Sequence, residues 1–139
     1  MENQSLGHYL KTLEERRPGD ILNLSDPIDR DLEFQALALE LEKQQYPPII
    51  RTRVKGYEDI PVVGNVFASR RRIAELLGEG GEAAVAQNWV RLEKSTIPPV
   101  IVPEGPVQEV VETEGIDLKA LPLLKYYQTD AGYYISSSI

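Results

Sequence analysis

The chain has 139 residues, with 15 basic and 22 acidic side chains that give a net charge of −7, one histidine and no cysteine. This length fits a single domain with a core of its own. The missing cysteines exclude disulfides, thiolate metal sites and a cysteine nucleophile. The negative charge speaks against binding of nucleic acid or of an anionic membrane, because both need positive surface.

Targeting and membrane signals are also missing from the sequence. No apolar run approaches the ~20 residues of a membrane-spanning helix, and residues 1–13 lack the basic and then apolar order of a signal peptide. We therefore expect a cytoplasmic protein. The single histidine, His8, cannot build a multi-histidine metal site and lies off the apolar stripe around it, so we predict a surface side chain.

The first half of the chain alternates between helical and strand patterns. Residues 5–16 place apolar side chains at helical spacing behind Ser5, a suitable N-cap, and predict a helix. A second helix is expected with Asp29 or Asp31 as its cap and an end near Gln45. Strand-like patterns predict β-strands at 20–24, 49–54 and 60–67, with a loop at 55–59.

Two further helices are predicted after the third strand. Ser69 is placed to cap a helix over residues 70–77. The glycine-rich stretch from Gly78 to Gly81 lacks the lysine and the strand-to-helix setting of a phosphate loop, which favours a turn between helices. The next helix, over 82–94, has an apolar stripe made of Val85, Trp89 and Leu92.

Prolines then change the character of the chain. Residues 95–106 predict an extended connector, 107–113 a strand and 115–122 a loop. Asp130 is the most interesting of the acidic residues, and we interpret it as a loop or Asx-turn residue, with acid–base chemistry as the alternative. The aromatic stretch 133–139 predicts a last strand, whose partner lies either in this domain or in a larger structure that the chain does not contain.

Charged residues gather in two stretches of opposite sign. The basic stretch can be a solvated face, a site for an anion such as phosphate, or a surface that docks on the acidic stretch. Its members are Arg51, Arg53, Lys55 and Arg70 to Arg72, and those of the acidic stretch are Glu104, Glu109, Glu112, Glu114 and Asp117.

Three parts of the chain, in this order and spacing, resemble the N-terminal portion of the UbiD-type decarboxylases, which use a prenylated flavin mononucleotide. The resemblance covers nearly the whole chain. The stretches that carry it are Gly19–Glu33, Val54–Arg70 with the helix that ends at Gly78, and the set Gly105–Val111, Ile116–Pro122 and Asp130–Ile135.

The resemblance implies an α+β fold in which a small mixed sheet is packed by three to four helices. Residues 1–105 would form the N-terminal α/β domain, and 106–139 a connector and the first strand of an absent split-barrel domain. In the family that domain holds prenylated FMN with manganese and potassium, and its catalytic, cofactor-binding and metal-binding residues lie beyond the point matched by Ile139. No such residue is assigned here, and only Ser136 to Ser138 are expected near the site of an intact protein.

Three functions remain open from the sequence. The first is the N-terminal domain of a carboxy-lyase that decarboxylates an aromatic or α,β-unsaturated acid without oxidation, in which this domain packs on the cofactor domain and closes the cleft. The second is a non-catalytic assembly subunit that completes a separate flavin-domain subunit. The third is an anion-binding module that uses Arg51, Arg53 and Arg70 to Arg72. We also expect a homo-oligomer and, for the chain alone, no activity and no bound flavin.

Overall fold

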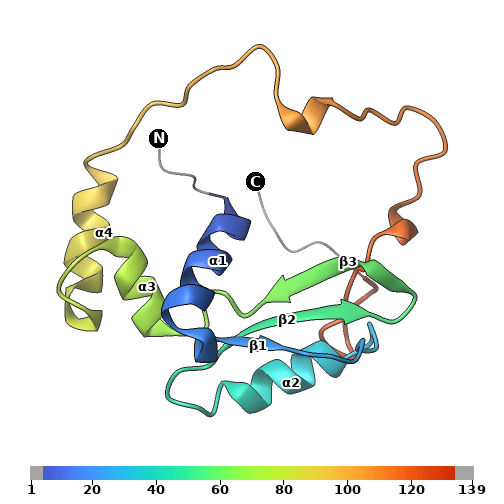
Figure 1. Ribbon diagram of the computed structural model, residues 1–139, viewed down its shortest axis with the longest axis horizontal. Coiled ribbons are helices and arrows are strands. Elements are labelled where there is room, and N and C mark those ends of the chain that lie inside the picture. The colour runs from blue at the N-terminus through green and yellow to red at the C-terminus, as the bar shows by residue number, and fades with distance from the viewer. Residues whose placement is uncertain (1–4, 134–139) are drawn as a thin grey trace.

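The computed structural model describes residues 5–133, which form an α+β fold around a small mixed sheet (Figure 1). Because the sheet is small, two helices cover it and two others pack beside it. The helices are α1 (Leu6–Arg16), α2 (Glu33–Leu41), α3 (Arg70–Leu77) and α4 (Val85–Glu93), and the strands are β1 (Ile21–Asn23), β2 (Ile49–Val54) and β3 (Tyr57–Gly64).

The three strands lie in the order β1-β2-β3, with β1 parallel to β2 and β2 antiparallel to β3. Helix α2 makes the crossover between the two parallel strands, and it lies below the sheet in Figure 1. The β2–β3 connection is a tight turn at Lys55 and Gly56, where Gly56 has a φ of 82°. Glycine adopts this left-handed conformation without steric cost, which allows the hairpin to close in so few residues.

The larger core lies between α2 and the sheet. Alternate residues of β2, Ile50 and Val54, are completely buried there against Phe34 of α2, because side chains of a strand point to opposite faces in turn. Gly64 of β3 faces the Phe34 ring so closely that a β-carbon would collide with it. Burial of these apolar side chains against α2 is what fixes the crossover helix on the sheet.

Helix α1 covers the opposite face of the sheet. Leu10 and Leu13 of this helix are buried with Ile21 of β1 and Ile49 of β2. The predicted helix over residues 5–16 is confirmed, and the side chain of Ser5 accepts a hydrogen bond from the backbone N–H of His8 at 3.2 Å. The two core clusters thus place the sheet between α1 and α2 (Figure 1).

Helices α3 and α4 pack beside one another at the α1 end of the sheet (Figure 1). Ser69 stands at the predicted N-cap of α3, but its hydroxyl makes no capping hydrogen bond. The predicted helix over 82–94 is a 3₁₀ turn at Glu82–Ala84 followed by α4. Its apolar stripe is not buried, since Trp89 is 62% exposed, and the buried residue of α4 is Asn88.

From Ser95 to Asp117 the chain runs as an exposed arc that leaves α4 and returns at the far end of the sheet (Figure 1). It contains one short 3₁₀ turn, Pro106–Gln108, and the expected extended connector is confirmed. A second 3₁₀ turn, Leu118–Ala120, follows it. The next residues, which we call the returning segment (121–133), enter the core again through Leu124, which is 5% exposed.

Three predicted elements are wrong in detail. The third strand runs over Tyr57–Gly64 and not over 60–67, because the turn at Gly56 is so tight that the charged residues after it already belong to the strand. The strand expected at 107–113 is absent, since these residues are exposed and no strand of the described sheet lies beside them. A β-strand needs a hydrogen-bonded neighbour.

The cap of α2 is the third difference. Neither Asp29 nor Asp31 caps the helix, whose N-cap is Leu32 with a φ of 67° and whose end is Leu41 rather than Gln45. The Asp29 carboxylate accepts from the N–H of Asp31 instead. The backbone of Leu32 is held in its unusual conformation by a hydrogen bond from its N–H to the carbonyl of Lys125, at 2.9 Å.

Candidate functional site

The first candidate site is the place where the returning segment docks on the domain. Asp31 and Lys125 form an isolated parallel bridge, and the N–H of Lys125 donates to the carbonyl of Arg30 at 2.9 Å. Leu124 is buried beside Phe34, and Tyr126 meets the Phe34 ring edge-on with 6.2 Å between centroids. The chain is therefore fixed to this domain by both backbone and apolar contacts.

Arg30 is the centre of this site. Its guanidinium lies 4.0 Å from the centre of the Tyr133 ring, and its Nη1 donates to the Tyr57 hydroxyl at 3.1 Å. The Tyr57 hydroxyl in turn donates to the carbonyl oxygen of Lys119 at 2.9 Å. A cleft of about 300 Å³ lies here, with Leu118, Leu121 and Leu123 as its apolar wall. One arginine thus links the hairpin, the 3₁₀ turn and the end of the returning segment.

Tyr133 is the last described residue, and its hydroxyl donates to Asp31 Oδ1 at 2.5 Å. This hydrogen bond to a carboxylate raises the pKa of Tyr133. Asp130 behaves as predicted for a loop residue, because its carboxylate accepts from the backbone N–H groups of Tyr126 and Tyr127 at 3.1 and 2.8 Å. The expected strand 133–139, with Ser136 to Ser138, lies outside the described residues apart from Tyr133.

The second candidate site is a network of charged side chains between α1 and α3. Arg17 reaches both carboxylate oxygens of Glu75 at 2.5 Å, and its Nε lies 3.1 Å from Asp20. Arg71 donates to both oxygens of Asp20, at 2.6 and 2.8 Å. The bond from Arg17 lowers the pKa of Glu75. Bidentate arginine–carboxylate pairs of this kind fix orientation as well as charge.

Arg72 is the buried member of this region, with no exposed surface. Its Nε donates to the carbonyl of Val66 and its Nη2 to that of Asn65, both at 3.1 Å, so it clamps the loop between β3 and α3. Among the described residues its Nη1 has no hydrogen-bond partner. Desolvation lowers the pKa of this guanidinium.

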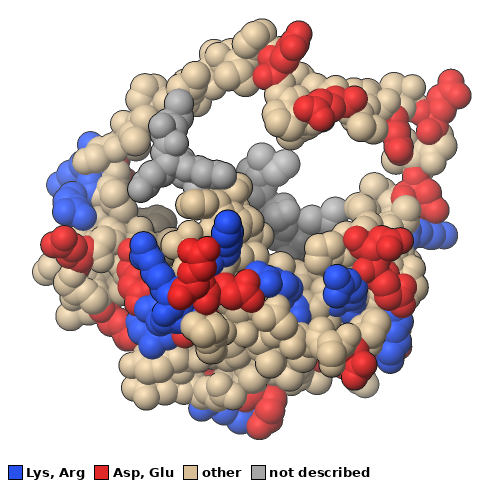
Figure 2. Space-filling model, in the orientation of Figure 1, with Lys and Arg blue, Asp and Glu red and all other residues tan. Residues whose placement is uncertain are grey.

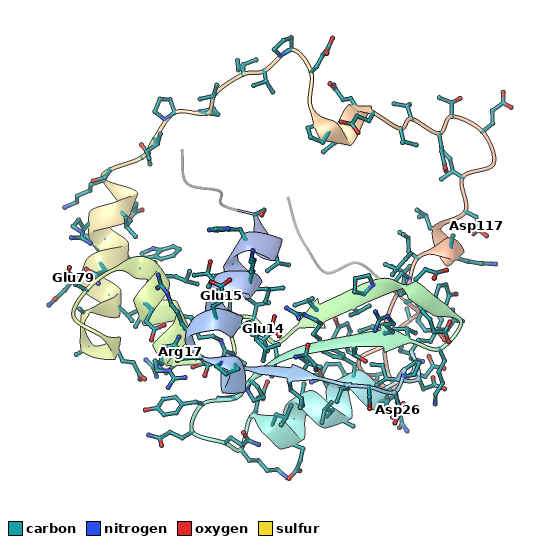
Figure 3. The ribbon with its side chains drawn as sticks, in the orientation of Figure 1. Glu14, Glu15, Arg17, Asp26, Glu79 and Asp117 are labelled. Atoms are coloured by element: carbon teal, nitrogen blue, oxygen red, sulfur yellow. The ribbon has the colours of Figure 1, made fainter. Side chains whose placement is uncertain are left out.

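The structure divides the basic stretch that the sequence singled out. Arg71 and Arg72 lie in the network, whereas Arg51 donates to Glu14 of α1 and to Asn23 of β1. Arg53, Lys55 and Arg70 are exposed. In the described part of the chain, none of the ion pairs joins the basic stretch to the acidic stretch. The side chains of the acidic stretch lie on the arc (Figures 2 and 3).

Other sequence-based interpretations are confirmed. The stretch from Gly78 to Gly81 is the turn between α3 and the helical segment after it, and Asn88 braces it by donating to the carbonyl of Glu79 at 2.8 Å. His8 is exposed.

No helix within residues 5–133 is long and apolar enough to cross a membrane.

The described residues do not fit a metal site. Residues 5–133 contain no group of three or more histidine, cysteine, aspartate or glutamate side chains that could hold a metal ion. Asp20 and Glu75 already serve arginines in the network.

Sequence reasoning missed the residues that organise both sites. Arg17 and Glu75 are separated by 58 positions, and Arg30 and Tyr133 by more than a hundred, so no local pattern joins them. One signal was available for Arg17, which stands at the end of an amphipathic helix just before Pro18 and Asp20. It indicated a helix terminus and not an ion pair.

Comparison with known proteins gives two family matches. Residues 12–88 match the N-terminal domain of 3-octaprenyl-4-hydroxybenzoate carboxy-lyase, and residues 100–139 match the Rift-related domain of the same carboxy-lyase. The interval between the two matches, residues 89–99, covers the end of α4 and the proline-rich start of the arc.

Two curated relatives and one solved enzyme illustrate the similarity. An uncharacterised protein of Aquifex aeolicus is 26% identical over 96% of this chain and 31% of its own length, and the anhydromevalonate phosphate decarboxylase of Aeropyrum pernix is 28% identical over 100% and 29%. Two structures of the UbiD-class enzyme HmfF from Pelotomaculum thermopropionicum, both 28% identical, cover 96% and 94% of this chain with TM-scores of 0.78 and 0.76. One is an evolved dimeric form with prFMN and the other contains FMN.

The chain spans about 30% of each of these proteins: 31% and 29% of the curated relatives, and 30% and 28% of the solved chains.

Proposed function

The chain belongs to the 3-octaprenyl-4-hydroxybenzoate carboxy-lyase (UbiD) family, and from this premise we propose that it acts as the docking and closing domain of a prenylated-FMN decarboxylase. In this proposal it supplies no catalytic residue. It holds the entry strand of the cofactor domain and covers the substrate cleft, which excludes water from the reacting centre.

The observation that carries the proposal is the docking of the returning segment. Residues 100–139 match the Rift-related domain, yet Leu124 is buried in the core of the N-terminal unit and Lys125 pairs with its backbone. A segment shared in this way ties the two domains together, because they cannot separate without breaking buried contacts.

The exposed arc indicates that a surface outside the described residues covers it. The arc carries a run of large apolar side chains that a domain in water does not usually leave exposed. These include Ile97 (88% exposed), Ile101 (93%), Val107 (91%) and Val110 (77%). In the proposal the cofactor domain packs on this arc.

The cofactor and the substrate are proposed from the relatives. HmfF is described in complex with prFMN, and the Aeropyrum pernix relative is an anhydromevalonate phosphate decarboxylase. We propose that the intact protein uses prenylated FMN, with manganese and potassium at its phosphate, to decarboxylate an aromatic or α,β-unsaturated acid. The flavin supplies the electron sink for loss of CO₂ when it is bound. We also propose that the intact protein is a cytoplasmic homo-oligomer.

The test compares the chain of 139 residues with the chain extended to the natural end of its reading frame. Hydrogen exchange of the amides in residues 95–117 is expected to be fast in the short chain and strongly slowed in the extended one. The extended chain, loaded with prenylated FMN, should release CO₂ from acids of the proposed classes. Unchanged exchange in the arc, or an extended chain that binds no flavin, would overturn the proposal.

The same exposed arc favours a second hypothesis, a non-catalytic assembly subunit, because a separate chain could cover the arc. The downstream reading frame separates the two. A stop codon after Ile139 followed by a separate flavin-domain gene favours the subunit, and continuous coding of a Rift-related domain favours the single enzyme.

A further inference from the structure

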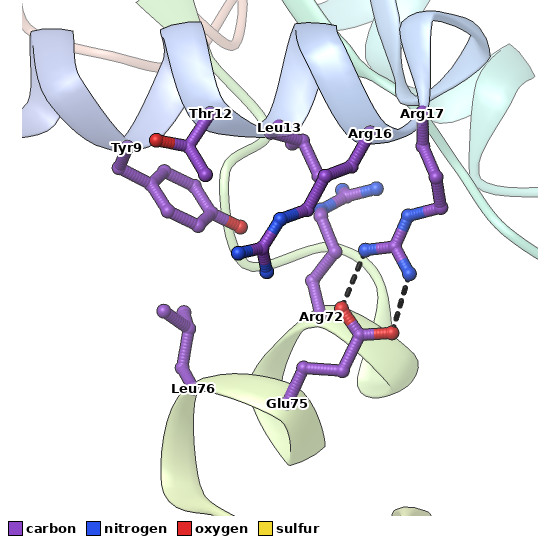
Figure 4. Close-up of a pocket in the computed structure, with 8 residues that line it drawn as sticks. All are labelled: Tyr9, Thr12, Leu13, Arg16, Arg17, Arg72, Glu75 and Leu76. Atoms are coloured by element: carbon purple, nitrogen blue, oxygen red, sulfur yellow. Dashed lines mark hydrogen bonds and ion pairs between the residues drawn. The ribbon is translucent and has the colours of Figure 1, made fainter.

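A cleft of about 350 Å³ opens between α1 and α3, away from the returning segment (Figure 4). Helix α1 and its C-cap contribute Tyr9, Arg16 and Arg17 to the lining of the cleft, and α3 contributes Arg72 and Glu75. Three arginines against one glutamate give the lining residues a net charge of 3 − 1 = +2. A positive cleft in a chain with a net charge of −7 is a local departure from the charge of the whole molecule.

The single carboxylate of the cleft is already neutralised. Both oxygens of Glu75 accept hydrogen bonds from Arg17, as the dashed lines in Figure 4 mark. Arg16 and Arg72 therefore supply the positive charge that no side chain of the cleft compensates. Arg16 is exposed and makes no ion pair with the described residues, and Figure 4 shows its guanidinium directed into the space beside the Tyr9 hydroxyl.

Arg72 provides a built element under this surface. It is fully buried, and two of its three nitrogens are used by the backbone of the β3–α3 loop. The third, Nη1, has no acceptor within residues 5–133. Because the Arg72 guanidinium is completely buried, an anion in the cleft would be attracted by its positive charge and would make no direct hydrogen bond to it.

We propose that this cleft binds a small oxyanion, a carboxylate or phosphate group, held by Arg16 and the Tyr9 hydroxyl above the buried charge of Arg72. Arginine suits this ligand because its planar guanidinium donates several hydrogen bonds to a pair of oxygens. The hydroxyl of Tyr9 adds a neutral donor, and Leu13 and Leu76 form the apolar part of the wall. The site is separate from the docking of the returning segment and does not depend on the decarboxylase proposal.

The test is an NMR titration of the ¹⁵N-labelled chain with orthophosphate, and in a second arm with acetate, at constant ionic strength set with sodium chloride. Saturable shifts confined to α1 and to the second half of α3 are expected. Tighter binding of orthophosphate identifies a phosphate ligand, and binding of acetate at least as tight identifies a carboxylate. Shifts that never saturate, or binding spread over the whole surface, would overturn the proposal.

Matched variants separate a site from general charge attraction. Because Arg72 also holds a loop, substituting it would disturb the fold, so the test uses R16Q and Tyr9→Phe. R16Q should weaken binding about tenfold, the order expected for a lost charge-assisted hydrogen bond, and Tyr9→Phe less. R53Q removes the same charge from an exposed position on β2 and should change the affinity by less than about twofold. Equal losses in R16Q and R53Q would contradict the site.

Discussion

Arg72 donates from Nε to the carbonyl oxygen of Val66 at 3.1 Å, although its side chain has no exposed surface. A cation is thus buried to hold a loop. The same side chain reaches the carbonyl of Asn65, whose φ is 63°. A non-glycine residue at this φ is strained and needs surrounding contacts to keep it there. The Arg72 clamp supplies those contacts in the loop that connects β3 to α3.

Replacing Arg72 with methionine should lower the free energy of unfolding by roughly 3 kcal/mol, because two charged hydrogen bonds to buried carbonyls are lost. Urea denaturation followed by circular dichroism measures the change. The control is Arg70→Met, an exposed arginine in the same helix, which should change stability by less than about 0.5 kcal/mol. Equal effects of the two substitutions would show that the clamp is not structural.

Leu124 tests whether the returning segment belongs to the core. Leu124→Ala should cost about 2–5 kcal/mol, the usual range for truncation of a buried leucine. Leu118, which is 63% exposed, gives the matched control, and Leu118→Ala should be nearly neutral. Chemical denaturation of both variants measures the difference. If Leu124→Ala were as mild as its control, the segment would not be docked on the N-terminal unit.

The Arg17–Glu75 pair predicts a pH dependence. The hydrogen bond lowers the pKa of Glu75 from its ordinary value of 4.5, so the folded state holds this proton less tightly than the unfolded state. The pair therefore stabilises the protein above pH 4.5, and this contribution is lost as the pH falls through the lowered pKa. Its size is small because Glu75 is 46% exposed.

Urea midpoints at pH 7 and pH 3 measure this dependence. Glu75→Gln should be less stable than the parent at pH 7, and the difference in stability between them should narrow at pH 3. The exposed Glu93 on α4 serves as control, and Glu93→Gln should run parallel to the parent at both pH values. A constant gap between Glu75→Gln and the parent would mean that the ion pair does not titrate as described.

Tyr57 bridges Arg30 and the carbonyl of Lys119 through its hydroxyl. Tyr57→Phe keeps the ring but removes both hydrogen bonds, so trypsin should cut after Lys119 several-fold faster, while global stability falls by only about 1 kcal/mol. Mass spectrometry of timed digests gives the rate. The control is Tyr46→Phe, because the Tyr46 ring lies 4.1 Å from the guanidinium of Arg71 and its hydroxyl takes no part in the bridge. This control should leave the cleavage rate unchanged, and an unchanged rate in Tyr57→Phe would contradict the bridge.

Local patterns predicted the regular elements well. Helical spacing with Ser5 in front gave α1 within one residue, and the β-branched run gave β2 with its bounds Ile49 and Val54. The fold class and the family also followed from the sequence. The bounds of α1 and β2 depend on neighbours along the chain, because spacing decides which side chains share a face. The family was inferred from the resemblance of three stretches of the sequence.

Features that depend on distant partners could not be predicted. The cap at Leu32 exists because Lys125 accepts its N–H, and no residue near position 32 indicates this. The stretch 107–113 has a strand-like sequence but no strand beside it in the described residues. In the same way, three consecutive arginines lie in three different environments: Arg70 is exposed, Arg71 pairs with Asp20, and Arg72 is buried.

The division of labour between this domain and the cofactor domain is the central claim, and co-elution of flavin tests it most directly. The chain of 139 residues and the chain extended to the end of its reading frame are each incubated with prenylated FMN and passed through a gel-filtration column. The account predicts flavin absorbance with the extended chain alone. Stoichiometric flavin eluting with the chain of 139 residues would contradict it.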